Sequence, residues 1–225
     1  MKILAIETSS DACSAALWHD GQNEEQYRLA PMQHTELLLP MIEALLSAAK
    51  ISLTQLDALA FGCGPGSFTG LRIAASVVQA LGFTLNLPVV PVSTLQTTAQ
   101  GAYREWGAKN ILVAFDARRG EIYWGVYRLM DGFMQAVIPD HLSAASQIPV
   151  IDETVLWLGV GDAWEIYADL SPALAEKLSQ IEANFKPHAR DVAELAKTLF
   201  AAGKYVTAEH ALPVYLRDAN LWKKS

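Results

Sequence analysis

The hydrophobic pattern at the start of the chain predicts three strands before any helix. Apolar residues run from Ile3 to Ile6, CSAALWH follows the turn ETSSDA, and the more polar QNEEQYRLA follows the turn HDG. Turns this short favour antiparallel pairing, so we predict a β-meander. A simple dinucleotide-binding domain begins with a βαβ unit and is therefore disfavoured.

A helical period then appears in HTELLLPMIEALLSAAK, where Leu38, Ile42 and Leu45 share one face. The short apolar strand LDALAFG leads through a glycine-rich loop into LRIAASVVQALGFTL, which is apolar almost all round. A helix of this kind is either buried in its own fold or covered by a partner. The strand PVVPVSTL and the helical segment TLQTTAQGAYREW complete an α/β alternation.

Strand-like alternation returns from about residue 107. NILVAFDARRGEIYWGVYRLMDG predicts two strands joined by the turn ARRG, and VLWLGVGDAWEIY predicts a strand, a glycine turn and a helix. ARDVAELAKTLFAAGK predicts an amphipathic helix ended by Gly203. We therefore predict an α/β fold of two lobes with mixed sheets, residues 1–106 and a smaller 107–225. The terminal segment is expected to pack against the first lobe.

Composition limits the function classes. The 225 residues are 52% hydrophobic and 18% charged, which suits a sizeable core, and 17 basic against 24 acidic residues give a net charge of −7. The basic pairs are Arg118-Arg119 and Lys223-Lys224, so direct, tight nucleic-acid binding is disfavoured. We find no signal peptide and no apolar run as long as a membrane span, and we expect a cytoplasmic protein without membrane association.

The loop GCGPGSFTGLR resembles a phosphate loop in composition only. It lacks the lysine of the Walker pattern and the spacing of the dinucleotide fingerprint. Two interpretations remain, a strand-to-helix turn capped by Ser67 or Thr69, and an anion site at the first N–H groups of the helix. Together with the turn ETSSDA, a nucleotide or anion site would comprise Glu7, Thr8, Ser9, Gly64, Gly66, Ser67, Phe68, Thr69 and Gly70.

The sequence offers no catalytic residue set and no metal ligand set. The five histidines are scattered, no H-x-x-x-H pair occurs, and no G-x-S-x-G elbow is present. In the turn after NILVAFD, Asp116, Arg118 and Glu121 predict an ion-paired, structural arrangement.

Six motifs occur in one order along most of the chain: ILAIETSSDACSAAL, H-x-x-x-L-L-P, GPGSFTGLRI, PVSTL, DARRGEIYWGVY and PVYLR. This set resembles the bacterial TsaB (YeaZ) family, a partner subunit in synthesis of the threonylcarbamoyl modification on adenosine 37 of tRNA. The string GPGSFTGLR is the most specific of them. The resemblance implies the two-lobed, actin-like and Hsp70-like ATPase (ASKHA) fold with a reduced second lobe.

The same resemblance brings in TsaD, the larger paralogue that carries the catalytic site. TsaD has a pair of metal-binding histidines where this chain has Thr94 and Thr98, and a hydroxyl is a poor ligand for a transition metal. The resemblance therefore implies a non-catalytic dimerisation subunit that supports TsaD, with the ATPase TsaE joining the complex. It implies no tightly bound cofactor, leaves ATP or ADP open in the complex, and allows a homodimer when the chain is alone.

The helices over about 34–49 and 69–85 would then pack against the same two helices of TsaD or of a second copy. The expected interface residues are His34, Leu38, Met41, Ile42, Leu45, Leu71, Arg72, Ala75, Val78 and Leu81. An ATP-dependent ATPase or phosphotransferase of the same superfold is the alternative. A glycoprotease-like metallopeptidase is a third, disfavoured by the missing histidine pair.

Overall fold

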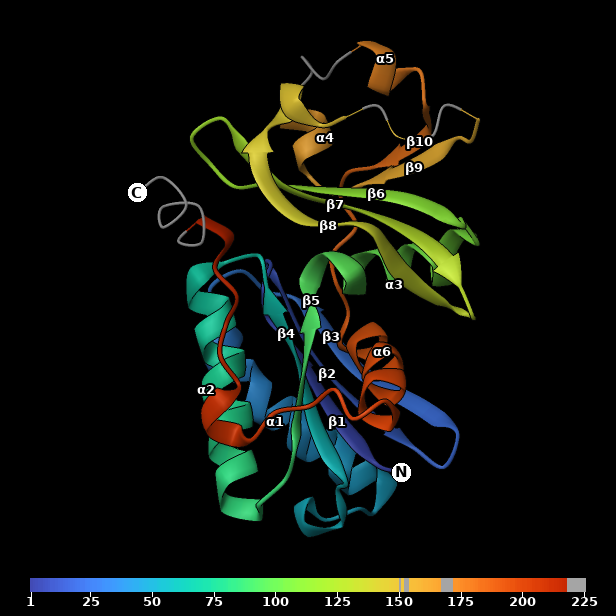
Figure 1. The fold of residues 1–225 in the computed structure, drawn as a ribbon. Coiled ribbons are helices and arrows are strands. Elements are labelled where there is room, and N and C mark those ends of the chain that lie inside the picture. Colours follow the sequence, from blue (N-terminus) through green and yellow to red (C-terminus); the bar gives the residue numbers. More distant parts are fainter. Residues whose placement is uncertain (150, 152–153, 167–171, 218–225) are drawn as a thin grey trace. The chain divides into compact units, whose positions relative to one another are not determined.

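The computed structural model describes residues 1–149, 151, 154–166 and 172–217, which form two compact units (Figure 1). The first unit contains Met1–Thr97 and Pro187–Val214, and the second contains Thr98–Lys186 and the segment that starts at Tyr215. This division differs from the predicted boundary after residue 106. The chain passes between units inside the continuous helix α3 (Thr94–Trp106), so no break in composition marks the boundary. Lys223-Lys224 lies outside the described residues.

The first unit is built on a mixed five-stranded sheet. Its strands are β1 (Ile3–Glu7), β2 (Ala12–His19), β3 (Gln22–Leu29), β4 (Ala58–Gly64) and β5 (Val89–Ser93), in the order β3-β2-β1-β4-β5. The first three strands pair antiparallel, while β4 and β5 add in parallel on the other side of β1. The predicted meander and mixed sheet are confirmed.

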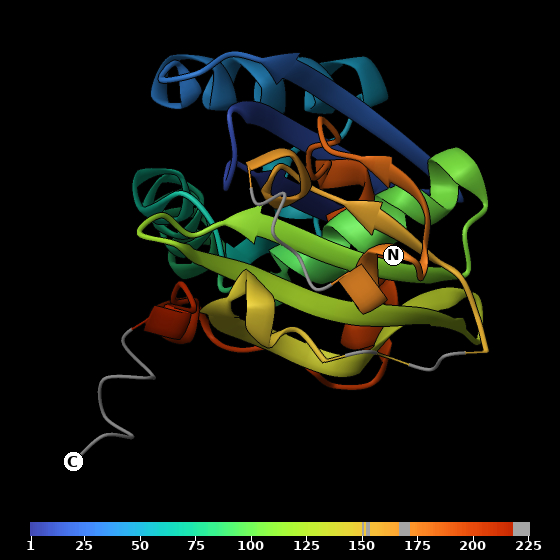
Figure 2. The ribbon, with the colours of Figure 1, turned by 90° about the horizontal axis from the view of Figure 1, so that it is seen from above.

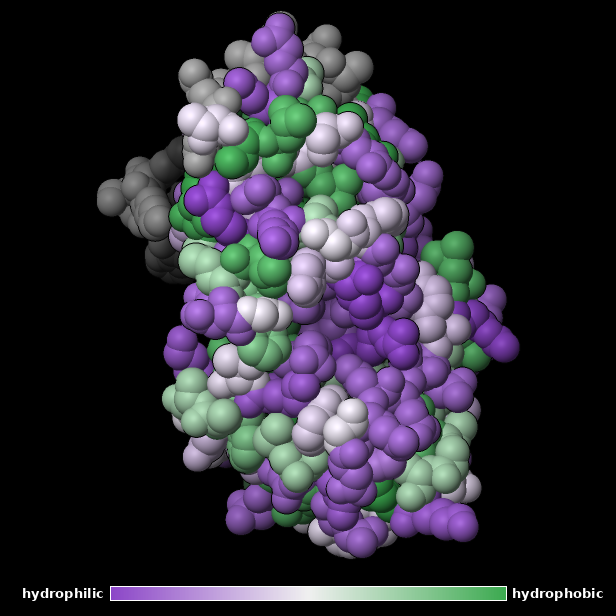
Figure 3. Space-filling view, turned by 90° about the vertical axis from the view of Figure 1, so that its right-hand side faces the viewer, coloured by the Kyte–Doolittle hydropathy of each residue, from purple (hydrophilic) through white to green (hydrophobic). Residues whose placement is uncertain are grey.

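Helices cover both faces of this sheet, so every residue of β1 and β4 is buried. Helices α1 (His34–Ala49) and α2 (Phe68–Leu85) lie on one face and α6 (Ala189–Ala201) lies on the other (Figure 1). The edge strand β3 is polar and largely exposed. A polar edge of this kind discourages pairing with another sheet. Figure 3 shows the right-hand side of Figure 1, where many hydrophilic side chains lie over the first unit.

Local signals determine the ends of α2. The Ser67 hydroxyl accepts a hydrogen bond from the Gly70 N–H at the start, and Asn86 ends the helix with a left-handed φ of 53°. The sequence has no uninterrupted apolar run as long as a membrane span. Among the residues that the structure describes, α2 is nevertheless the one helix that is long and apolar enough to cross a membrane. Leu71, Ala75 and Val78 nevertheless pack it onto the first unit.

The second unit repeats the topology of the first. Its strands are β6 (Asn110–Asp116), β7 (Glu121–Met130), β8 (Phe133–Ala144), β9 (Trp157–Val160) and β10 (Leu178–Glu182), in the order β10-β9-β6-β7-β8. Again a three-stranded antiparallel meander comes first, seen from green to yellow in Figure 2, and two parallel strands follow. The helices are shorter, since α4 (Ala163–Ile166) stands where α2 stands in the first unit and α5 (Pro172–Ala175) is equally brief.

Candidate functional site

The β1–β2 turn and the glycine loop, predicted separately, lie against each other. The Ser67 N–H donates to the Ser9 carbonyl at 2.7 Å, and the Thr8 hydroxyl donates to the Gly70 carbonyl at 2.8 Å. The structure therefore brings Thr8, Ser9 and the residues Gly64–Gly70 together at one end of the first sheet.

Close packing explains two of the glycines in this region. A Cβ at Gly70 would lie 1.8 Å from the Thr8 carbonyl oxygen, and a Cβ at Gly62 would lie 1.8 Å from Glu7 Oε2. No other residue type fits without moving backbone or a buried carboxyl. The loop composition thus follows from its contact with the β1–β2 turn, whether or not an anion binds.

Some of the N–H groups at the start of α2 that could bind an anion already donate hydrogen bonds within the protein. The Ser67 N–H is bonded to Ser9, and the Gly70 N–H donates to the Ser67 hydroxyl at 3.3 Å. These are two of the N–H groups on which an anion site over Ser67–Gly70 would rely. The contacts favour the interpretation of the loop as a helix-starting turn.

Glu7 is the most unusual ionisable group of this region. Burial raises the pKa of its carboxyl, while hydrogen bonds from Ser9 and Thr8 oppose that rise. Oε1 accepts the Ser9 N–H at 2.6 Å, and Oε2 has no hydrogen-bond partner among the described residues. Burial, followed by the charge of Glu7, raises the pKa of the Cys13 thiol to about 11, which keeps that thiol protonated.

Thr94 and Thr98, the residues at which the resemblance leads us to expect histidines in the catalytic paralogue, lie one turn apart in α3 and are buried. In the part of the chain that the structure describes, no three His, Cys, Asp or Glu side chains gather closely enough to hold a metal ion.

Most of the predicted interface residues point into the first unit rather than away from it. Packing against the sheet buries His34, Leu38, Ile42, Leu45, Leu71, Ala75 and Val78, and half-buries Met41 and Leu81. The chain itself therefore covers the buried side chains of this set, and of these buried residues Leu38 also lines the groove described next. Arg72 alone of the predicted set is exposed.

An apolar groove lies on the outer side of the same two helices. It has a volume of about 490 Å³ and is lined by Thr35, Leu38, Leu39, Phe68, Thr69, Arg72, Ile73, Ser76 and Val77. Leu39 and Phe68 are 52% and 55% exposed. The Arg72 guanidinium sits 3.9 Å above the Phe68 ring, so a cation–π contact orders one side of the groove.

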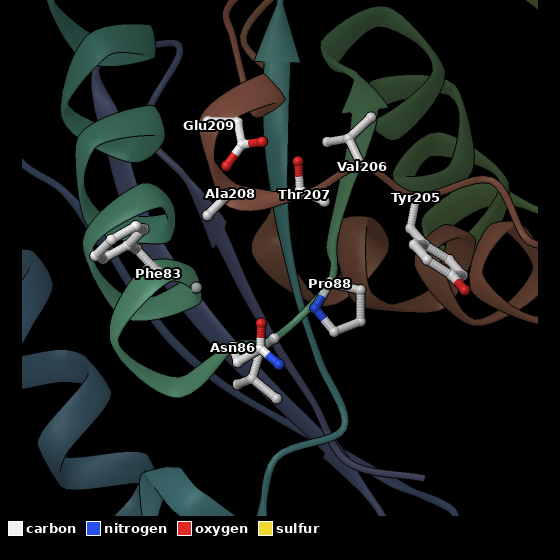
Figure 4. Close-up of a pocket in the computed structure, with 10 residues that line it drawn as sticks. Phe83, Asn86, Pro88, Tyr205, Val206, Thr207, Ala208 and Glu209 are labelled. Carbon is white, nitrogen blue, oxygen red and sulfur yellow. The ribbon is translucent and has the colours of Figure 1, made fainter.

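A second hollow, of about 290 Å³, lies where α2 ends. Gly82, Phe83, Asn86, Leu87, Pro88 and residues 205–209 line it (Figure 4). The backbones of Val206 and Val89 exchange two hydrogen bonds of 2.9 Å, which attach this late segment to the beginning of β5. Sequence reasoning missed the hollow because its two sides are far apart in the chain and neither carries a motif.

In the second unit, the turn between β6 and β7 brings together the three residues predicted there. The Asp116 carboxylate accepts the Arg118 N–H at 2.7 Å and also pairs with the Arg118 guanidinium at 3.1 Å. Glu121 instead pairs with Arg217, which reaches the turn from the C-terminal segment.

The two sheets have the same topology, in which a meander is followed by two parallel strands, and the helices of the second unit are shorter. This arrangement is the actin-like ATPase fold.

The family model of TsaD, described as tRNA N6-adenosine threonylcarbamoyltransferase, matches residues 27–225. The "tRNA threonylcarbamoyladenosine biosynthesis protein TsaB" of Escherichia coli K12 is 42% identical, over 100% of this chain and 98% of that protein. Its namesake from Haemophilus influenzae is 34% identical, over 100% and 97%. The solved structure of YeaZ from Pseudomonas aeruginosa superposes with a TM-score of 0.91 at 43% identity, over 96% of this chain and 99% of that one. The chain belongs to the TsaB (YeaZ) family.

Proposed function

We propose that this chain is a non-catalytic subunit that supports TsaD in threonylcarbamoyl transfer to N6 of adenosine 37, in tRNAs that read codons starting with A. Its full-length relatives are named for threonylcarbamoyladenosine biosynthesis, and the matching family model is named for the transferase itself. TsaE would join the same complex. The observation that carries the proposal is the exposed apolar groove between α1 and α2.

This groove suits a helical partner. Its apolar side chains come from two adjacent helices, and Leu39 and Phe68 stay half exposed in the single chain. Exposed apolar surface of this kind typically marks a protein interface. Two helices of TsaD, or of a second copy, would cover it as a four-helix arrangement. The partner surface thus comprises Leu39, Phe68, Arg72 and the groove between them, in place of the core-facing residues.

The non-catalytic part of the proposal rests on chemistry. Thr94 and Thr98 stand where the resemblance places histidines in the catalytic paralogue. A buried hydroxyl does not replace imidazole as a ligand for a transition metal. Transfer chemistry is therefore assigned to TsaD, and this chain contributes structure.

Charge substitutions in the groove test the interface. Leu39→Glu and Phe68→Glu would place an unpaired carboxylate in the contact, and each should weaken heterodimer formation with TsaD more than tenfold. Phe83→Glu is the matched control, because Phe83 is 81% exposed on the same helix but lies outside the groove. Sedimentation velocity with purified TsaD measures the effect. Equal association of the groove variants and the control would contradict this interface.

Reconstitution tests the functional part. TsaD, TsaE and the enzyme that makes threonylcarbamoyl-AMP are combined with a tRNA transcript, with and without this chain. We expect modification to depend on the chain, and undiminished modification in its absence would contradict the proposal.

The contact between the β1–β2 turn and the glycine loop at one end of the first sheet is the observation behind a second candidate, nucleotide binding by this chain. Calorimetry with Mg-ATP on the isolated protein separates the two, because the subunit role requires no binding and an ATPase or phosphotransferase requires micromolar affinity.

A further inference from the structure

The turn between β6 and β7, at the left of the second unit in Figure 1, has an unusual backbone. Arg118 and Arg119 adopt left-handed φ angles of 66° and 60°, and Gly120 follows at 78°. The Glu121 N–H closes the turn on the Arg118 carbonyl at 3.2 Å. Asparagine, aspartate and glycine are the residues that normally occupy such positions, because a longer side chain crowds the backbone there.

Contacts on the inner side of the turn hold it in this conformation. The Arg118 N–H donates to Asp116, and the Asp116 N–H donates to Asp162 Oδ1 at 2.9 Å. Arg217 donates to the Ala117 carbonyl at 2.8 Å. Backbone strain that is held by surrounding structure is characteristic of functional positions.

The outer side of the turn carries two exposed arginines. The Arg118 side chain is 86% exposed, and its guanidinium pairs with Asp116, whose side chain is only 8% exposed. Arg119 is exposed and has no ion-pair or hydrogen-bond partner among the residues described. Glu121, the other carboxylate of the turn, is occupied by Arg217. A chain of net charge −7 thus presents two arginines at one projecting tip.

We propose that Arg118 and Arg119 contact the phosphodiester backbone of tRNA when this chain is assembled with TsaD, an inference that rests on the proposed function. The planar guanidinium suits phosphate oxygens, which it can contact through two parallel hydrogen bonds. A free nucleotide is usually held in a concave pocket, whereas a projecting hairpin reaches an extended backbone. Two contacts add to binding by the complex without making this acidic chain an RNA binder by itself.

The test compares two double variants in the complex with TsaD. Arg118→Asn with Arg119→Asn removes both charges and retains side chains that tolerate the left-handed conformation, while Arg118→Lys with Arg119→Lys retains the charges. Fluorescence anisotropy with an unmodified tRNA transcript is measured over a series of salt concentrations. The asparagine variant should bind about tenfold more weakly at low salt, with a log–log salt slope smaller by about two. The lysine variant should keep a slope close to that of the wild type.

Sedimentation with TsaD and calorimetry with Mg-ADP complete the design. If the asparagine variant assembles normally and binds tRNA with unchanged affinity and slope, the phosphate contact is wrong and the proposed function stands. If the asparagine variant no longer assembles with TsaD, the arginines contact a protein, and the inference is overturned. If it loses ADP binding but still binds tRNA normally, the arginines contact a nucleotide, and the inference is overturned as well. Failure of the wild-type chain to assemble with TsaD would overturn the proposed function first, and the tRNA contact with it.

Discussion

A buried carboxyl at the end of β1 determines which residues can stand next to it. Glu7 Oε2 lies so close to Gly62 that a Cβ there would be 1.8 Å away. The same steric logic applies between Thr8 and Gly70, so the glycines of the loop are required by the neighbouring turn. Sequence reasoning found the right residues but could not decide their role, because no spacing rule predicts that this loop touches Thr8 and Ser9.

At this scale the pH dependence of stability is predictable. Burial raises the pKa of Glu7 in the folded state above its ordinary 4.5, so the native state holds this proton more tightly than the unfolded state does. The contribution of Glu7 to stability is therefore full below the unfolded pKa and is lost as the pH rises through the folded pKa. Glu7→Gln removes this titration, so the stability of the variant relative to the wild type should increase from pH 4 towards pH 8.

Urea denaturation of both proteins at several pH values measures the difference in the free energy of unfolding. Other titrating groups cancel in that difference, and any fixed cost of the amide shifts it equally at every pH. A difference that does not change with pH would contradict the raised pKa.

At the scale of elements, the sequence predicts which helices and strands form, but not which side of each helix faces the core. The meander and the helices α1, α2 and α6 follow from periodicity and end signals. In α2, however, apolar residues occur on all sides, so the pattern could not say that Val78 faces the core while Phe68 and Phe83 face outward. Which residues of α2 face inward depends on tertiary structure, because it is decided by the side of the helix that packs on the sheet.

The N-terminus of α6 is a second feature that the local sequence does not predict, because its hydrogen-bond acceptors come from distant strands. The helix has no side-chain cap of its own, and the sheet supplies the missing acceptors. Ser14 Oγ accepts the Ala189 N–H at 2.9 Å, and Glu25 Oε1 accepts the Arg190 N–H at 3.1 Å. Glu25 Oε2 also lies 3.0 Å from His188 Nδ1. A carboxylate of β3 thus stabilises the N-terminus of a helix far away in sequence.

We expect Glu25→Ala to lower the free energy of unfolding by about 2 kcal/mol, because the Glu25 side chain is only 7% exposed and its removal takes away the acceptor of the Arg190 N–H and the ion-pair partner of His188 and Arg190. Glu24→Ala is the matched control on the same strand. The Glu24 side chain is 43% exposed and lies 3.5 Å from His19, so its loss should change stability by less than about 0.5 kcal/mol. Chemical denaturation at pH 7 compares the two, and equal effects would contradict the capping role.

At the scale of the whole molecule, the first unit is discontinuous in sequence. Residues 187–214 contribute α6, which covers one face of the sheet, and Val206, which pairs with Val89. The sequence prediction assigns residues 107–225 to the second lobe and expects the terminal segment to pack against the first. The structure instead groups all of Pro187–Val214 with the first unit and the segment from Tyr215 with the second, and the passage through α3 carries no linker-like residues that would indicate it.

This discontinuity leads to a prediction about fragments. A chain that ends at residue 106 contains all five strands of the first sheet but lacks α6, so the apolar face that α6 covers would be exposed to water. We expect that fragment to unfold without cooperativity. Residues 1–97 joined to 187–214 by a flexible Gly/Ser linker of about ten residues restore both faces and should unfold in one cooperative transition. Circular dichroism in urea and the dispersion of amide NMR signals distinguish the two fragments. A cooperative transition in the shorter fragment would show that the first unit folds without residues 187–214 and would contradict the prediction.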